Sequence, residues 1–162
     1  MIVILFKVAN YEIARQKMLE ELTILVREAG SAALVRQQAL AGLSVTSKGH
    51  LDFVTDADRA VEVLIADRIA LHHPDDGFLG EEGRRLEGRS GRTWIVDPID
   101  GTHTFVRGGA SWAVSIGVVS DRAVAAALNA PVERNLLVAE AGKGYGATAR
   151  SCVNAGSKAS SA

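Results

Sequence analysis

The sequence has little of several features that mark particular classes of protein. Its 162 residues include one cysteine, Cys152, so no disulfide can form within the chain, which fits a reducing compartment. The formal net charge is only −1, so no overall field favours binding to nucleic acid or to an anionic membrane. There is no internal repeat and no sustained heptad pattern.

The sequence also lacks a long hydrophobic run. The apolar start, Met1 to Phe6, is too short to cross a bilayer. It has neither the basic segment nor the small-residue cleavage site of a secretory signal. We therefore expect a cytoplasmic protein with neither nucleic acid nor membrane as a partner.

The hydrophobic content, 48% of the residues, is enough for one ordinary domain with a buried core. We expect this domain to cover residues 1–148. Residues 149–162 are rich in serine and alanine without an apolar period, and we expect them to form a disordered tail.

Two segments have apolar residues at the three- and four-residue spacing of a helix. The first runs from Tyr11 to a stop at Gly42, and the second from Thr55 or Asp56, either of which can cap a helix, to about His72. The expected buried stripes are Met18, Leu22, Leu25, Val26 and Ala29 in the first helix and Val61, Leu64, Ile65 and Ile69 in the second.

Short apolar runs between turn signals predict strands in the rest of the chain. We expect strands at 43–48, 93–96, 113–119, 124–128 and 136–139, a turn at 49–50, and loops at 84–92 and 142–146. The last three runs follow one another closely, which predicts an antiparallel meander.

The stretch with the most chemistry is 94–102, where an apolar strand ends in a polar turn. Asp97 and Asp100 are three residues apart, Pro98 restricts the backbone, and Gly101 permits a sharp turn close to a ligand. Converging carboxylates repel one another unless a cation neutralises them, and Mg²⁺ prefers carboxylate and phosphate oxygens. The N–H groups around Thr102 would suit an anion. A plain turn in which the two acids cap their own backbone is the alternative interpretation.

Other acids have two interpretations each. Asp56 and Asp58 lie at an expected helix N-terminus, where the helix dipole alone favours them. Glu81 and Glu82, between glycines, could form a solvated turn or direct one carboxylate toward a metal. His103, next to the turn, is better explained by packing or by a place at the rim of the site than by a role as general base.

Four separated pieces of sequence, in order and in spacing, resemble the inositol monophosphatase family of the magnesium-dependent, lithium-sensitive phosphatases. They are Lys48 with Asp52-Phe53-Val54-Thr55 and Asp58, then Gly80-Glu81-Glu82, then Asp97-Pro98-Ile99-Asp100-Gly101-Thr102, then Trp112-Ala113-Val114-Ser115-Ile116. The resemblance covers nearly all of the chain, from about residue 22 to 148.

This resemblance implies a metal site for two or three Mg²⁺ ions. Its ligands would be the carboxylates of Glu81, Asp97 and Asp100 and the main-chain carbonyl of Ile99. The cofactor expected is therefore Mg²⁺, and the partner a small phosphorylated substrate.

The resemblance also implies catalytic and substrate-binding roles. Asp58 would pair with the Thr102 hydroxyl to orient and activate the attacking water, and Glu81 would assist catalysis. The phosphate would bind at Gly101 and Thr102, beside Ile99 and Asp100. Lys48 and Asp52 would lie at the rim or assist a further metal.

The fold implied is α+β, the layered α/β sandwich of the sugar phosphatases, with two long helices packed on a mostly antiparallel sheet. Members of the family continue into a second half, where the aspartate of a Trp-Asp pair completes the metal site. No Trp-Asp pair occurs here. We therefore expect the chain to correspond to the N-terminal half only. Half of a layered fold exposes a sheet edge and apolar surface, and such surface favours aggregation or a homodimer.

The function expected is Mg²⁺-dependent hydrolysis of a small phosphomonoester, such as inositol monophosphate, by metal-activated water. Within the family, the alternatives are a 3′(2′),5′-bisphosphate nucleotidase, a fructose-1,6-bisphosphatase and a histidinol-phosphatase. Two further hypotheses stay open: a catalytically inactive remnant that binds a partner or dimerises, and an anion-binding module that uses the Gly101–Thr102 turn without metal.

Overall fold

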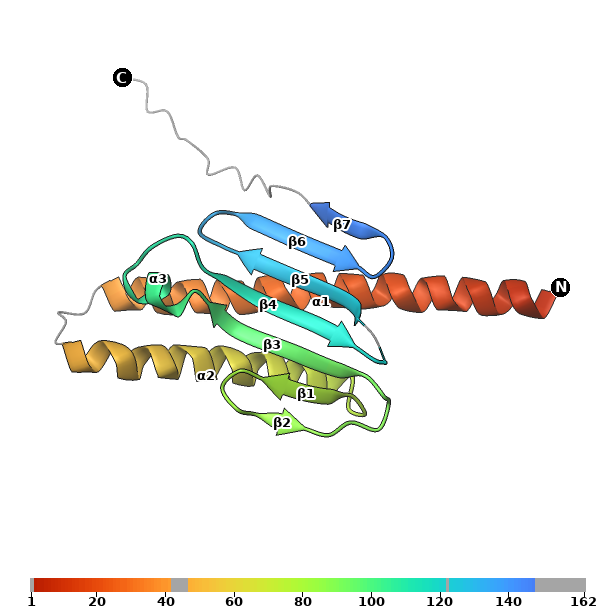
Figure 1. Ribbon diagram of the computed structural model, residues 1–162, viewed down its shortest axis with the longest axis horizontal. Coiled ribbons are helices and arrows are strands. Elements are labelled where there is room, and N and C mark those ends of the chain that lie inside the picture. The colour runs from red at the N-terminus through yellow and green to blue at the C-terminus, as the bar shows by residue number, and fades with distance from the viewer. Residues whose placement is uncertain (1, 42–46, 122, 148–162) are drawn as a thin grey trace, which may run out of the picture.

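Two long helices lie side by side on one face of a mixed sheet (Figure 1). This computed structural model describes residues 2–41, 47–121 and 123–147, with side chains described at 10–40, 56–121 and 123–143. The helices are α1 (Ile2–Ala41) and α2 (Ser47–His72). The arrangement confirms the expected α+β fold with two long helices packed on a sheet.

The sheet has seven described strands in the order β2-β1-β3-β4-β5-β6-β7. Only the pair β1–β3 is parallel, and the other neighbours are antiparallel. The run from β3 to β7 is thus an antiparallel meander, which confirms the meander expected for the runs at 113–119, 124–128 and 136–139. The strands are β1 (Gly77–Gly80), β2 (Arg85–Leu86), β3 (Thr93–Asp100), β4 (Ala113–Val119), β5 (Ala123–Ala130), β6 (Asn135–Glu140) and β7 (Gly144–Ala147).

The core lies between the helices and the sheet. Helix α1 packs on β4 and β5, and α2 packs on β3. The helical stripes are buried as their spacing predicted, except that Leu64 is only partly buried. Alternate residues of each strand face the helices, among them Trp94 and Val96 of β3 and Val114, Ile116 and Val118 of β4.

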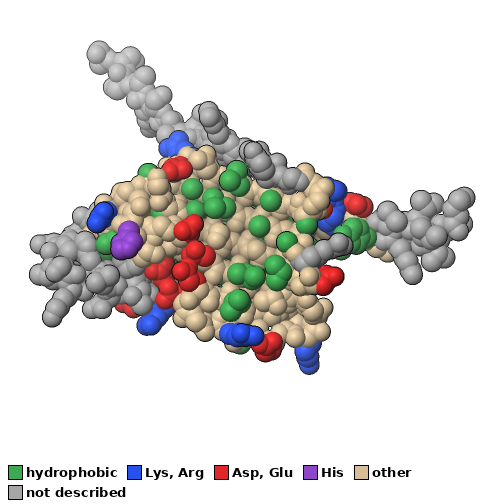
Figure 2. Space-filling view, viewed as in Figure 1, with side chains coloured by type: hydrophobic (Ala, Val, Ile, Leu, Met, Phe, Trp, Pro, Cys, Tyr) green, Lys and Arg blue, Asp and Glu red, His purple; other side chains and the backbone are tan. Residues whose placement is uncertain are grey.

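The other face of the sheet has no cover among the described residues. Leu79 of β1, Ile95 of β3 and Leu137 of β6 lie on it and are 40–42% exposed. Figure 2 shows hydrophobic side chains spread over this face, with a group of acidic side chains at its margin. We call this surface the open face.

A buried aspartate joins the end of α2 to the sheet. Asp76, whose side chain is 1% exposed, accepts hydrogen bonds from Trp94 Nε1 at 2.9 Å, Ser90 Oγ at 2.5 Å and the Arg92 guanidinium. Burial acts to raise the pKa of Asp76, but these donors, Ser90 and Trp94 before Arg92, together lower it. The carboxylate therefore stabilises the connection that leads into β1.

Several expected boundaries are wrong. Helix α1 begins at Ile2 and not at Tyr11, and α2 begins at Ser47, so the turn at 49–50 and the last two residues of the expected strand at 43–48 are helical. Strand β3 continues to Asp100, and β7 begins at Gly144 inside an expected loop. Residues 43–46 and the expected tail at 149–162 lie outside the described residues. Over the part of the chain that the structure describes, no helix combines the length and the hydropathy needed to cross a membrane.

Candidate active site

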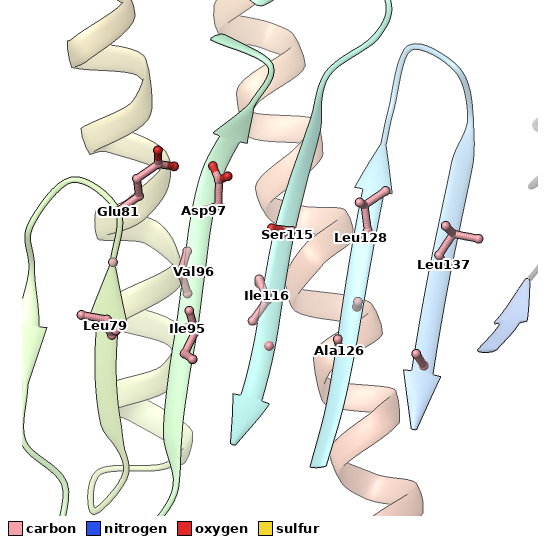
Figure 3. Close-up of a pocket in the computed structure, with 14 residues that line it drawn as sticks. Leu79, Glu81, Ile95, Val96, Asp97, Ser115, Ile116, Ala126, Leu128 and Leu137 are labelled. Atoms are coloured by element: carbon pink, nitrogen blue, oxygen red, sulfur yellow. The ribbon is translucent and has the colours of Figure 1, made fainter. Parts of the chain in front are cut away.

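The parallel pairing of β1 and β3 brings together two acids from distant parts of the sequence. Gly80 pairs with Val96, and the Glu81 N–H donates to the Val96 carbonyl at 3.0 Å, so Glu81 and Asp97 follow at the same level of the sheet. Leu79 and Ile95 precede them by two residues on the open face, and the strand period places the two acids on that same face. Figure 3 shows the two carboxylates beside one another, Glu81 just past the end of β1 and Asp97 on β3.

The Asp97 carboxyl is held in an unfavourable environment. Burial, then a hydrogen bond and repulsion with the Glu81 carboxyl and repulsion from Asp100, raise the pKa of Asp97 to about 7; a hydrogen bond from the Ile99 backbone acts in the other direction. Asp97 Oδ1 is buried and has no hydrogen-bond partner. A buried acceptor without a donor costs free energy, which a cation at this position would recover.

Helix α2 supplies another buried acid. Asp58 is 5% exposed, and burial raises its pKa to about 7, with further contributions from the negative charges of Glu82, Glu81 and Glu62. Asp58 and Glu62 are one helical turn apart, so both face the end of β1. The site therefore concentrates acids from α2, β1 and β3.

After Asp97 the chain leaves the regular ladder and turns. Asp97 pairs with Ser115 of β4 and Asp100 pairs with Ala113, with a register shift between them. Pro98 fits this irregular segment because it needs no ladder donor. Gly101 then adopts φ 91°, ψ 35°, and a Cβ there would lie 2.9 Å from the Ser111 carbonyl, so glycine is required both by the dihedral and by the space.

The short helix α3 (Thr102–Val106) begins directly after this glycine. The Gly101 carbonyl accepts from the N–H groups of Thr104 at 2.8 Å and Phe105 at 3.0 Å. The Thr102 hydroxyl donates to the Ile99 carbonyl at 3.1 Å, so its proton is directed there and not toward Asp58. The Ile99 carbonyl keeps a second lone pair for another partner.

A buried glutamine on α1 fixes the far end of this turn. Gln37 is 6% exposed and donates through Nε2 to the carbonyls of Phe105 at 3.1 Å and Gly109 at 2.9 Å. Phe105 packs edge-on against Trp112, with ring centroids 4.9 Å apart. The turn is thus attached both to the helical layer and to the start of β4.

The structure brings only some of the expected site residues together. Glu81 and Asp97 are adjacent. Asp100 is close enough to raise the pKa of Asp97, and Glu81 is close enough to raise the pKa of Asp58. Asp100 and Thr102 are exposed at the turn, as is His103 on α3. Within the described ranges, no three Asp, Glu, His or Cys side chains are gathered closely enough to hold one metal ion. The side chains of Lys48 and Asp52 lie outside the described part.

Sequence reasoning gave no role to two residues that contact the site. Glu62 and Gln37 are both buried and hydrogen-bond to backbone groups that flank the site. The four-residue spacing from Asp58 was the available signal for Glu62. No comparable signal marks Gln37, because its partners are 68 and 72 residues away in the sequence.

Taken together, these features define an α+β protein with an acidic centre on two parallel strands, β1 and β3, beside a glycine turn. A model of the inositol monophosphatase family matches residues 14–160. The chain belongs to this family.

Named relatives and a solved structure agree with this assignment. The chain is 35% identical over 133 residues to an inositol-1-monophosphatase of Rhizobium meliloti, which covers 81% of this chain and 50% of the relative. It is 48% identical over 79 residues to a histidinol-phosphatase of Mycobacterium tuberculosis, which covers 49% of this chain and 30% of the relative. The crystal structure of extragenic suppressor protein suhB from Bartonella henselae matches with a TM-score of 0.71 at 32% identity, covering 82% of this chain and 52% of that one.

The extent of these matches bears on function. The chain spans about half the length, or less, of the relatives that it matches. Membership therefore establishes a phosphatase family, while the activity of the chain, its substrate and its metal are matters for proposal.

Proposed function

We propose that this chain contributes the acidic half of a magnesium-dependent phosphomonoesterase site, with a small phosphate ester as substrate. The main support is the Asp97 carboxyl. Its Oδ1 is buried without a hydrogen-bond partner, and the carboxyl lies next to that of Glu81. Several carboxyl groups meet here and repel one another, and a divalent ion is the natural partner that would neutralise them.

The residues fit a hard cation at the Glu81–Asp97 pair. Glu81 directly follows β1, Asp97 lies on the adjacent parallel strand β3 where its regular pairing with β4 ends, and the Ile99 carbonyl and the exposed Asp100 follow on β3. We propose these four residues as ligands divided between two or three ions, since no three of the described acids are gathered around one point. A divalent cation held there would neutralise charge on the phosphate ester and acidify a water molecule.

The chain's own groups would handle the phosphate and the proton. The first N–H groups of a helix have no acceptor within the helix. In α3 the Gly101 carbonyl accepts from the N–H groups of Thr104 and Phe105, which leaves the N–H groups of Thr102 and His103 available for a ligand. We propose that they bind phosphate oxygens. Asp58, with a pKa of about 7, is suited to accept a proton from the attacking water near neutral pH, once the Thr102 hydroxyl turns toward it.

The test is cation binding followed by catalysis. We expect Mn²⁺ or Mg²⁺ to bind at pH 7.5 by isothermal titration calorimetry, and Asp97→Asn to weaken binding at least about tenfold. The matched control is Asp121→Asn, an exposed acid in the turn after β4. Phosphate release should then be assayed on inositol monophosphate and histidinol phosphate. Equal binding by wild type and Asp97→Asn would refute the ligand assignment.

A second function is favoured by one observation, the uncovered apolar surface. The open face forms a hollow of about 810 Å³ whose lining includes Leu79, Ile95 and Leu137. Surfaces of this kind mark association sites, so non-catalytic association through the sheet is the alternative. A protein that binds no cation and releases no phosphate, but sediments as a dimer, would favour it.

A further inference from the structure

Glu62 is a buried acid that the chemistry proposed above does not use. It lies on α2, one turn after Asp58, and is 4% exposed. A buried carboxylate is costly unless it is hydrogen-bonded. Its partner is the backbone N–H of Glu82, which donates to Glu62 Oε2 at 2.9 Å.

The same carboxylate also lies directly over Gly80. A Cβ added at Gly80 would be 2.1 Å from Glu62 Oε2 and 2.3 Å from Glu62 Cδ, closer than any side chain tolerates. Glycine at position 80 therefore leaves the room that the carboxylate occupies. Glu62 contacts the residue before Glu81 by packing and the residue after it by a hydrogen bond.

The other N–H groups of this turn donate to backbone carbonyls, and only the Glu82 N–H depends on Glu62. The Glu81 N–H is held by Val96 at 3.0 Å, the Gly80 N–H by the Arg84 carbonyl at 2.8 Å, and the Gly83 N–H weakly by the Gly80 carbonyl at 3.3 Å. The Glu82 N–H has Glu62 as its acceptor. Without that acceptor, the peptide that follows Glu81 could rotate, and the Glu81 side chain would lose its direction toward Asp97.

We propose that Glu62 is a positioning residue for Glu81. It fixes the Gly80–Glu81–Glu82 turn from the side of α2, so that the Glu81 carboxylate meets Asp97 across the parallel strands. What Glu81 then does with a cation rests on the function proposed above, but the positioning itself does not.

The experiment compares two near-isosteric variants. Glu62→Gln keeps an acceptor oxygen for the Glu82 N–H, and Glu62→Leu keeps the volume without an acceptor. The control is Glu20→Leu, which removes an exposed acid from α1. The first measurement is hydrogen exchange of the Glu82 amide by NMR, and the second is Mn²⁺ affinity by calorimetry.

We expect Glu62→Leu to speed exchange of the Glu82 amide at least about tenfold and to weaken Mn²⁺ binding at least about tenfold. Glu62→Gln should stay within about threefold of wild type in both measurements, and Glu20→Leu should change neither. Protection of the Glu82 amide that survives in Glu62→Leu would overturn the proposal. Equal loss of affinity in the Gln and Leu variants would also overturn it, because the charge and not the hydrogen bond would then matter.

Two features keep the test decisive. If Glu62→Leu fails to fold, Gly80→Ala displaces the same carboxylate from the other side, and the same loss of Glu82 protection is expected, with retained protection as the contrary result. If wild type binds no Mn²⁺, the proposed function fails, while exchange of the Glu82 amide still decides whether Glu62 positions the turn.

Discussion

At the scale of single residues, the acids of the site are held at a cost to stability. Asp58 and Asp97 have an ordinary pKa of 3.8 and a pKa of about 7 in the folded chain. The folded chain therefore binds more protons than the unfolded chain between about pH 4 and pH 7. By linkage, the free energy of unfolding falls as the pH rises through this range.

This sign gives a prediction for the metal-free protein. Its unfolding midpoint should fall by at least about 5 °C between pH 5 and pH 8, measured by circular dichroism in EDTA. In Asp97→Asn the midpoint should depend less on pH, because the variant side chain does not ionise. In the wild-type protein, added Mg²⁺ should raise the midpoint again at pH 8. A midpoint that rises over this range would contradict the assignment of both pKa values.

Gly101 is a second residue whose identity is decided locally. Its φ of 91° and the 2.9 Å approach of the Ser111 carbonyl both oppose a side chain. Gly101→Ala should lower the free energy of unfolding by about 1–3 kcal/mol, measured by urea denaturation. Gly83→Ala is the matched control, since Gly83 has a similar φ of 95° but open space around it. An equal loss in the two variants would show that the contact with Ser111 adds nothing.

At the scale of elements, Gly30 marks a close approach of helix α1 to strand β5. A Cβ at Gly30 of α1 would be 2.2 Å from Nδ2 of Asn129 on β5, and Asn129 Nδ2 donates to the Val26 carbonyl at 3.2 Å. Alanine is favoured over glycine by about 1 kcal/mol in a helix interior, so intrinsic propensity and packing oppose each other here. At 2.2 Å from a buried side chain, packing decides.

We therefore expect Gly30→Ala to destabilise the fold by about 1–3 kcal/mol in urea titrations. In an Asn129→Ala background, the same substitution should be neutral or stabilising, because the obstructing amide is gone. Additive effects of the two substitutions would argue against the contact. The double-mutant comparison thus separates packing from helix propensity.

The elements also show what the sequence can and cannot predict. Strand β4 was predicted with its bounds, because an apolar run between turn signals is a local pattern. The starts of α1 and α2 were missed. Residues 2–10 are mostly apolar and so show no helical alternation of apolar and polar faces, and Thr55 is a good cap that the helix nevertheless runs through. Local cap chemistry is a weaker determinant than continuation of a helix already formed.

The site depends on pairing that is not local. The acids at Glu81 and Asp97 are visible in the sequence, but their adjacency comes from the parallel pairing of β1 with β3. Sequence reasoning assigned no role to Glu62. Its contact with Gly80 and Glu82 follows from the packing of α2 beneath β1, which no spacing rule supplies.

At the scale of the whole molecule, the helices cover one face of the sheet and leave the open face to solvent among the described residues. Small residues lie there too: Gly117 pairs with Ile95 on one side and with Ala126 on the other. Figure 3 shows Ala126 between the larger side chains Ile95 and Leu137. The acids of the site lie at one margin of this face, so whatever covers the open face would also lie next to the site.

We therefore expect the 162-residue chain to bind the hydrophobic dye 8-anilinonaphthalene-1-sulfonate while folded. Ile95→Lys should reduce the dye fluorescence at least about twofold, because Ile95 is central on the open face and 42% exposed. Its unfolding midpoint should stay within about 3 °C of wild type, since a residue this exposed contributes little to the core. Leu71→Lys, on the outer side of α2 and 68% exposed, is the control that should leave the fluorescence unchanged. Equal fluorescence in all three proteins would mean that the dye does not bind at the open face.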